Sequence, residues 1–564
     1  MKRLKVLLLW DAHYEPHVNA NLALLETLAL DNEKVVVIIC PSYYKEKHGI
    51  LSNVICDQEL GNSRLSFRKQ LGRPFRQILG WVRNRPGPTL LSQLNCYPQV
   101  QFISSYSLVK KHIVESTREQ ASSLSLTRLL EVERYGIKLA PHWSVDLSLD
   151  CKTLLNDICV GSPQDILLRS LAFHSFLILE ALSSFCASSK DESLQFISTS
   201  VYSLDWLCRE YVLAQGSRHV FVQVLQASSR PSCKVYKSVP EDLFLRRGLQ
   251  AQFFGGYELL NGAVTYASNY IANRISLSSH HTYSPLDSDL GVMAERLAGP
   301  LGIQEKPLWV YYTNSPDELV SIAHAYQSSE MREYIPWIDS GFLRNESEAI
   351  MAIVALAHKR GASLVVRQHP RLWCEKRSQF VSSTYGSLSR LLREQQLKFP
   401  GVLTIIEPWE HVNSYELAIL SDKVISFRGT MPLEVSLLGI KPIVLARNKG
   451  IMNYWIQLHA ESAPKSMEEL ELLLSSDFSD GFSMDEMCCF LIQFYLLNQY
   501  GTVELARDHC SAKFLSIALE RGSSVSHEPA APSSAVELRA VEQVNQLIEA
   551  YFLRVYNNLI DCFF

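Results

Sequence analysis

The stretch VISFRGTMPLEVSLLGIKPIVLA, residues 424–446, constrains the fold more than any other part of the chain. Its apolar run over 424–427 predicts a buried strand, and the segment over about 431–438 has the composition of a short helix. A second apolar run over 443–446 follows a turn that contains Pro442 and predicts another strand. Strand, helix and strand in this order are typical of one unit of a parallel α/β sheet.

The loop between the first strand and the helix reads Arg428-Gly429-Thr430 and has the composition of an anion-binding loop. Thr430 suits the cap of the helix, and Pro432 suits its first turn. Backbone N–H groups at the start of a helix attract anions, and the guanidinium of Arg428 adds a positive fork. The loop therefore predicts a site that holds a phosphate.

Two further series of alternating strands and helices extend this pattern along the chain. In the N-terminal series, apolar strands over 6–10 and 35–40 flank a helix over 19–30. In the C-terminal series, strands over 308–313 and 363–370 precede the opening stretch. Continuous apolar strands indicate a parallel sheet covered on both faces. The expected fold class is α/β, with two Rossmann-like domains facing a cleft and additional C-terminal helices.

The length of 564 residues is enough for several domains. We expect an N-terminal Rossmann-like domain over 1–300 and a C-terminal Rossmann-like domain over 301–483. A helical region follows over 484–564, with a Ser/Pro/Ala-rich linker near 522–534.

The bulk composition is that of a globular chain that keeps its cysteines reduced. The net charge of −4 gives no general case for nucleic-acid binding. The 13 cysteines show no C-x-x-C pairs, which fits neither a disulfide framework nor a zinc site and favours the cytosol. No apolar run is long enough to span a bilayer, so we expect any membrane contact to be peripheral.

Polar residues gather after four strands of the C-terminal series. They occur at 313–317 (TNSPD), 367–370 (RQHP), 408–415 (PWEHVNSY) and 426–430. Because ligands in open α/β sheets bind beyond the carboxyl ends of the strands, this distribution predicts a nucleotide and phosphate site. The structural alternative is that polar residues collect at any strand-to-loop junction.

Four elements together resemble the capsule and surface-polysaccharide biosynthesis glycosyltransferases. They are TNSPDE at 313–318, VVRQHP at 365–370, EPWEHVNSYELAILSD at 407–422 and VISFRGTMPLEVSLLGIKPIVL at 424–445. The resemblance covers residues 309–455 and extends to the N-terminal half only in the order of strands and helices. It implies the GT-B architecture, in which the C-terminal Rossmann-like domain holds most of the donor nucleotide and the N-terminal domain binds the acceptor.

The resemblance also implies which residues bind the donor. They are Arg367, His369, Ser414, Tyr415, Ser426, Arg428, Gly429, Thr430 and Glu434. In this reading His369 meets the nucleotide or its phosphate, the loop after the strand at 424–427 holds the phosphate, and Glu434 accepts hydrogen bonds from a ribose. The loop departs from the Gly-Ser-Thr or Ser-Ser sequence usual in the family, which either adds a phosphate contact or alters donor use.

Structural alternatives stay open for three of these residues. His369 could be an ordinary loop histidine before a proline. Arg367 could pair with an acid such as Glu407 for purely structural reasons, and Glu434 could only stabilise a helix N-terminus electrostatically.

The candidate catalytic residues are Asp11 and His13, which follow the first strand of the N-terminal series. If transfer inverts the anomeric centre, a carboxylate or histidine should deprotonate the acceptor hydroxyl. Asp11 could equally well only turn the chain after the strand. No D-x-D element stands at a strand end, since 287–289 lies in a Pro/Ser-rich region, so the sequence implies no metal and no cofactor besides the nucleotide-sugar substrate.

Two segments outside the sheets carry apolar and charged residues together. Residues 64–85, RLSFRKQLGRPFRQILGWVRNR, are basic with interleaved aromatics and contain no acid. They fit an anionic membrane surface, a charged acceptor or a solvated basic face equally well. The final helix, over about 536–559, is expected to dock on the protein itself.

The sequence thus predicts a glycosyltransferase that moves a sugar from a nucleotide-sugar donor, with CMP as one reasonable nucleotide, to a polysaccharide or lipid-linked glycan acceptor. We expect it in the cytoplasm, with peripheral contact at the inner face of the membrane as one option. The alternatives are a GT-B-fold nucleotide-sugar epimerase and a catalytically degenerate assembly or export partner.

Overall fold

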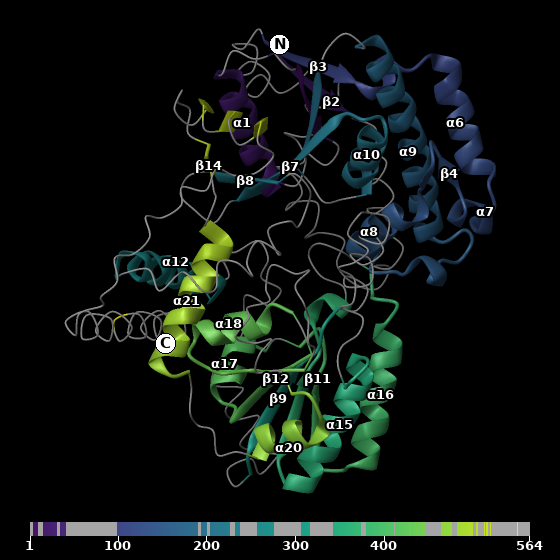
Figure 1. Ribbon diagram of the computed structural model, residues 1–564. Helices are drawn as coiled ribbons and strands as arrows, with labels where there is room; N and C mark the ends of the chain where they lie inside the picture. The colour runs from purple at the N-terminus through teal and green to yellow at the C-terminus, as the bar shows by residue number, and fades with distance from the viewer. Residues whose placement is uncertain are drawn as a thin grey trace, which may run out of the picture. The chain divides into compact units, whose positions relative to one another are not determined.

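The computed structural model describes two compact units of the chain (Figure 1). The described residues are 4–9, 15–30, 34–40, 99–189, 193–199, 203–225, 232–236, 257–275, 306–315, 342–373, 380–410, 412–427, 429–445, 464–475, 482–499, 503–505, 512–513, 515–516, 519–520 and 550. Unit 1 comprises Met1–Asp242, Val320–Glu330 and Gly501–His527, and unit 2 comprises Leu243–Leu319, Met331–Tyr500 and Glu528–Phe564.

These units do not follow the predicted domain boundaries. Helix α12 (Tyr257–Ile275) falls within the expected N-terminal domain but packs against α21 (Met484–Gln499) in unit 2. Strand β14 (Val503–Glu504) falls within the expected C-terminal helical region but pairs with the sheet of unit 1. Both departures are contacts between segments far apart in sequence, which local patterns do not reveal. The predicted linker near 522–534 and the final helix lie almost entirely outside the described residues.

The sheet of unit 1 has the strand order β14-β8-β7-β6-β1-β2-β3. Its strands are β1 (Leu4–Leu9), β2 (Val35–Ile39), β3 (Val100–Ser104), β6 (Leu194–Ser198), β7 (Arg218–Leu225), β8 (Ser232–Tyr236) and β14. From β3 to β7 all neighbours are parallel, whereas β8 pairs antiparallel with β7 and β14. The five parallel strands, numbered in chain order, therefore run 3-2-1-4-5, the order of a Rossmann-like sheet.

Helices cover this sheet because its strands are apolar on both faces. The helices of unit 1 are α1 (Glu15–Leu30), α6 (Lys111–Ser123), α7 (Leu126–Leu130), α8 (Ala140–Cys151), α9 (Pro163–Ser188) and α10 (Ser203–Ala214). Of these, α1 and α10 pack directly on strands of the sheet, whereas α6 and α8 pack on α9. Two short 3-10 helices, η1 (Ser105–Leu108) and η2 (Leu155–Asp157), and the two-stranded pair β4 (Glu133–Arg134) and β5 (Ile137–Lys138) complete the described part of unit 1.

Helix α9 is the longest helix among the described residues of unit 1. Ser162 caps it by accepting a hydrogen bond from the Asp165 N–H, and Pro163 occupies its first turn. By length and apolar composition it could cross a membrane, but 78% of its most apolar window is buried. It packs against α6, α8 and α10, as expected for the core helix of a globular unit.

Unit 2 repeats the same strand order in a fully parallel sheet, β11-β10-β9-β12-β13. Its strands are β9 (Leu308–Tyr312), β10 (Ser363–Arg367), β11 (Leu403–Ile406), β12 (Lys423–Ser426) and β13 (Ile443–Val444). Its helices are α12, α15 (Glu346–Arg360), η6 (Pro370–Leu372), α16 (Tyr385–Lys398), α17 (Ser414–Ile419), α18 (Met431–Leu437), α20 (Met467–Ser475) and α21.

The opening stretch folds as the sequence predicts, except that β12 begins and ends one residue earlier and β13 is two residues shorter. Helices α15 and α16 pack on each other and on β10 and β11, and α18 packs beside β12 (Figure 1). The expectation of an α/β chain with two sheets built on parallel strands is confirmed, and the order of these strands is compatible with a Rossmann-like arrangement of each unit.

Candidate functional site

The candidate site of unit 2 lies where the strand order reverses. Strand β9 is the first strand of its sheet, β10 and β11 lie on one side of it, and β12 and β13 lie on the other. The chain therefore leaves β9 and β12 in diverging directions at their carboxyl ends. In open α/β sheets this switch point is where ligands bind.

The loops after β9 and β12 approach each other closely at this switch point. Gly429 has a φ of +103°, and a Cβ at this position would stand 3.0 Å from the Asn314 Oδ1 atom. The amide orientation of Asn314 is fixed because both its backbone N–H and its Nδ2 donate to Glu346 Oε1, at 2.8 and 3.1 Å. Glycine is therefore required at position 429, where the backbone stays open to an approaching ligand.

The loop after β9 is also bound to the loop after β10. The Thr313 Oγ1 accepts a hydrogen bond from the His369 N–H at 2.9 Å. Beside it, the Arg371 Nε donates to the Ser315 Oγ at 3.2 Å. Polar contacts between mostly buried side chains thus join the loops after β9 and β10 at the carboxyl edge of the sheet.

His369 lies at the start of η6 and has a defined role there. Its Nδ1 accepts a hydrogen bond from the Arg371 N–H at 3.1 Å, so the ring caps this short helix. Because Nδ1 is an acceptor, the ring proton of the neutral imidazole is on Nε2. The side chain is only partly buried.

Arg367 is completely enclosed and does not face a ligand. Only 1% of it is exposed, and its guanidinium donates to the carbonyl oxygens of Gln368, Glu407 and Glu410 at 3.1, 2.8 and 3.4 Å. Burial lowers the pKa of the guanidinium to about 10. The alternative of a carboxylate pair with Glu407 is also not found, because Arg367 contacts the carbonyl of that residue. Arg367 holds the loop after β11 in place.

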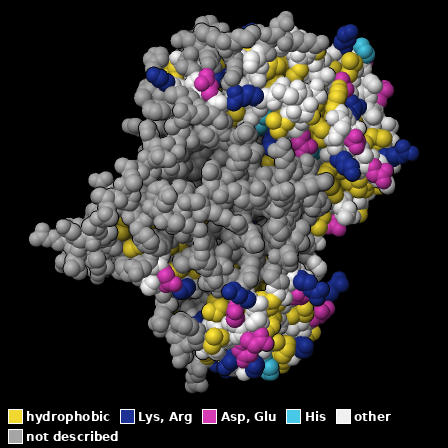
Figure 2. Space-filling model, viewed as in Figure 1, with side chains coloured by type: hydrophobic (Ala, Val, Ile, Leu, Met, Phe, Trp, Pro, Cys, Tyr) yellow, Lys and Arg dark blue, Asp and Glu magenta, His cyan; other side chains and the backbone are white. Residues whose placement is uncertain are grey.

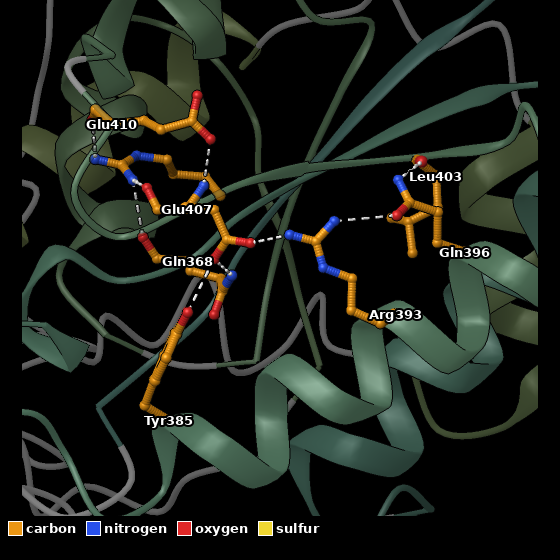
Figure 3. Close-up of polar contacts among 8 residues, drawn as sticks. Gln368, Tyr385, Arg393, Gln396, Leu403, Glu407 and Glu410 are labelled. Carbon is orange, nitrogen blue, oxygen red and sulfur yellow. Dashed lines mark hydrogen bonds and ion pairs between the residues drawn. The ribbon is translucent and has the colours of Figure 1, made fainter.

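The Glu407 carboxylate is the centre of a second network at the same loop (Figure 3). It accepts hydrogen bonds from Gln368 Nε2 at 2.7 Å and from the Tyr385 hydroxyl at 3.3 Å, and it pairs with Arg393. The backbone N–H of Glu407 donates to Glu410 Oε1 at 2.8 Å. The network ties β10, α16 and the loop after β11 together.

Glu434 and Tyr415 form a buried cluster instead of lining an open pocket. The Glu434 residue is 2% exposed, its carboxylate pairs with Arg274 of α12, and it accepts a hydrogen bond of 2.6 Å from the Tyr415 hydroxyl. Burial, and then the Glu434 charge, raise the pKa of Tyr415 well above its usual value. Both carboxylate oxygens of Glu434 are engaged, so this structure gives no support to the expected ribose contact.

The remaining described candidates are Ser414, Ser426 and Thr430, and the hydrogen bonds of the first two involve backbone carbonyl oxygens. The Ser414 carbonyl accepts from the Tyr312 hydroxyl at 2.6 Å, and the Ser426 hydroxyl, which is buried, donates to the Tyr312 carbonyl at 3.3 Å. Thr430 occupies the predicted N-cap position of α18, but it has helical backbone angles and its side chain makes no capping hydrogen bond. Its hydroxyl is therefore not committed to the helix.

Some predicted residues lie outside the described part of the chain. They are Asp11, His13, Arg428 and the basic segment 64–85. Among the described residues, no group of three or more His, Cys, Asp or Glu could hold a metal ion. On the face shown in Figure 2, basic and acidic side chains of the described residues are interspersed without a single-sign field.

The sequence did not single out Glu346 and Arg371 as parts of the site, and it pointed to Asn314 only within the polar segment 313–317. Asn314 stood within the TNSPD segment as one polar residue among several, and only its fixed amide distinguishes it. Glu346 begins α15, where an acid has the ordinary explanation of a favourable helix dipole. Comparison of the chain with models of known protein families and with curated proteins found no match.

Proposed function

We propose that the protein is a glycosyltransferase of GT-B type that binds a nucleotide-sugar donor at the switch point of unit 2. The observation that carries the proposal is the approach of Gly429 to Asn314, next to the polar contacts of His369. A glycine backbone facing a fixed amide, next to a partly buried imidazole, suits the phosphate and ribose of a nucleotide. The resemblance of residues 309–455 to surface-polysaccharide glycosyltransferases supports the same reading.

The residues of unit 2 divide into ligand-facing and supporting groups. His369 offers its Nε2–H to a phosphate or ribose oxygen, and the backbone at Gly429 and Thr430 receives the phosphate. Arg428 lies between described residues of the same loop and would add a charge-assisted contact. Arg367 acts only through the loop after β11 that it holds, and Glu434 acts only through the packing of α18 against α12 and α17.

The strand order of unit 1 supports the proposal that this unit binds the acceptor and supplies the catalytic base. Strand β1 neighbours β6 at the switch point of that sheet, and Asp11 follows the last residue of β1, Leu9, by two positions. A carboxylate that follows this strand is suitably placed in the chain to accept the proton of an acceptor hydroxyl, with His13 as the second candidate. The acceptor class remains a polysaccharide or a lipid-linked glycan.

A product assay with labelled CMP-, UDP- and GDP-sugars tests the proposal. A transferase releases nucleotide and attaches label to an added surface-glycan or glycolipid acceptor fraction, and Asp11→Ala lowers this transfer while leaving donor binding intact. Conversion of the free nucleotide sugar without acceptor would instead identify an epimerase. Failure of the wild type to bind or turn over any of the donors would contradict the proposal and favour a degenerate assembly partner.

A further inference from the structure

Three aromatic side chains meet at the carboxyl edge of the unit 2 sheet, and we refer to them as the aromatic cluster. The ring centroids of Trp373 and Trp409 are 4.7 Å apart, and those of Trp373 and Tyr385 are 5.3 Å apart. Tyr385 also contacts Trp409, at 6.0 Å. Trp409 is 46% exposed, which leaves a large part of its indole open to solvent. The cluster therefore presents one exposed aromatic face beside polar strand ends.

The aromatic cluster lies on the nucleotide side of the switch point. Trp373 follows η6 after β10, and Trp409 lies in the loop after β11. Neighbouring strands are about 4.8 Å apart, so the ends of β10 and β11 lie roughly 5 and 10 Å from the end of β9. A nucleoside extends over a similar length, so a nucleotide with its phosphate at the β9–β12 switch point could place its base near the ends of β10 and β11. His369 and η6 directly precede Trp373 in the chain.

The loop that carries Trp409 is held by hydrogen bonds to its backbone. Arg367 donates to the carbonyl oxygens of Glu407 and Glu410, which flank Trp409 on either side. The Glu407 N–H donates to the Glu410 carboxylate, which closes the turn (Figure 3). Tyr385 is held at the same place by its hydroxyl bond to Glu407. Enclosing a guanidinium costs free energy unless it is hydrogen-bonded, so these carbonyl contacts hold the loop as a rigid support for an exposed indole.

We propose that the aromatic cluster seats the base of the bound nucleotide, with the exposed face of Trp409 stacking on it. The inference rests on the proposed donor site and adds its base-binding part. A nucleobase suits the cluster better than an acceptor glycan because the residues proposed to bind the phosphate lie in the same unit and along the same sheet edge. Stacking is tolerant of base identity, since every base has a π-face.

The experiment measures binding of CMP, UMP, AMP and GMP, with ribose 5-phosphate as a probe that lacks the base. Isothermal titration is performed on the wild type, Trp409→Ala, Trp409→Phe and the control Leu397→Ala. Leu397 belongs to α16, like Tyr385, and is 83% exposed without ring contacts among the described residues. Trp409→Ala is expected to weaken the tightest nucleotide by roughly 5- to 150-fold, the range for loss of one base–aromatic stack.

The other measurements distinguish loss of base stacking from loss of the loop structure. Trp409→Phe retains most of the affinity, ribose 5-phosphate binds the wild type and Trp409→Ala equally, and Leu397→Ala behaves as the wild type. Unchanged nucleotide affinity in Trp409→Ala would overturn the base seat while leaving the donor site intact. Equal losses for nucleotide and ribose 5-phosphate would also overturn it, because the loop itself would then be responsible. Absence of nucleotide binding by the wild type would overturn both proposals.

Discussion

The Oδ1 atom of Asn314 stands 3.0 Å from the position that a Cβ of residue 429 would occupy. This relationship joins the loops after β9 and β12, which are separated by more than a hundred residues in the sequence. Asn314 cannot withdraw easily, because Glu346 holds its N–H and its side-chain amide. The geometry of the candidate phosphate loop therefore depends on a glycine and on an acid at the start of α15.

Gly429→Ala should disturb nucleotide binding more than it disturbs stability. The new methyl group would be strained by the positive φ and would press on Asn314. The expected loss is about 1–2 kcal/mol of unfolding free energy and at least a tenfold loss of nucleotide affinity. Gly401→Ala is the matched control, because Gly401 also has a positive φ, of +76°, but no atom within 4 Å of the added Cβ. Equal nucleotide affinity in the two variants would contradict this account of the loop.

The buried pair of Arg274 and Glu434 should show strong coupling in a double-mutant cycle. Arg274→Met leaves a buried carboxylate, and Glu434→Gln leaves a buried guanidinium, so each single variant should lose about 3–5 kcal/mol of stability. The double variant should lose much less than the sum, since the new amide oxygen at position 434 can still accept from the Tyr415 hydroxyl and no charge of the pair remains. Urea unfolding measures the three variants, and additive losses would show that the pair does not join α12 to α18.

Unit 1 should lose stability as the pH falls, through the buried residue His219. Burial, and secondarily the charge of Arg209, lower the pKa of His219 from 6.5 to about 3. The unfolded chain binds a proton below about pH 6.5 and the folded protein does not, so this stability is complete above pH 6.5. It should decline by roughly 1.4 kcal/mol per pH unit between about pH 6 and pH 3.

His219→Gln should flatten this dependence while keeping a hydrogen-bond partner for the Ser198 hydroxyl, which lies 2.9 Å from the imidazole Nε2. His112→Gln is the control, because His112 is exposed on α6. Unfolding free energies measured from pH 7 to pH 4 compare the variants. An unchanged slope in His219→Gln would mean that other groups cause the acid sensitivity.

The sheets could be predicted from the sequence because their strands are continuous apolar runs that end in polar loops. Residues 424–446 gave the strand, loop, helix and strand of the structure almost at their observed limits. The roles of Arg367 and Glu434 could not be predicted in the same way. Arg367 binds carbonyl oxygens forty residues away, and Glu434 pairs with Arg274 from a helix 160 residues earlier. Such partners are set by tertiary packing, which the local sequence composition does not show.

The role of His369 is the most accessible part of the proposed donor site. His369→Ala removes both the Nε2–H donor and the acceptor that caps η6. His369→Asn supplies a side-chain oxygen that can still accept from the Arg371 N–H, so it preserves the loop better than alanine does. Loss of nucleotide binding in both variants would assign the effect to the imidazole, whereas binding retained in His369→Asn would assign it to the cap.

The central claim is that unit 2 binds a nucleotide at its switch point, and a thermal-shift titration with CMP, UDP and GDP tests it most directly. At 100 times the Kd, a ligand specific for the folded state adds about 2.7 kcal/mol of stability. We predict that at least one of the three nucleotides raises the Tm of the wild type and that His369→Ala abolishes the shift. No shift of the wild type with any nucleotide would contradict the claim.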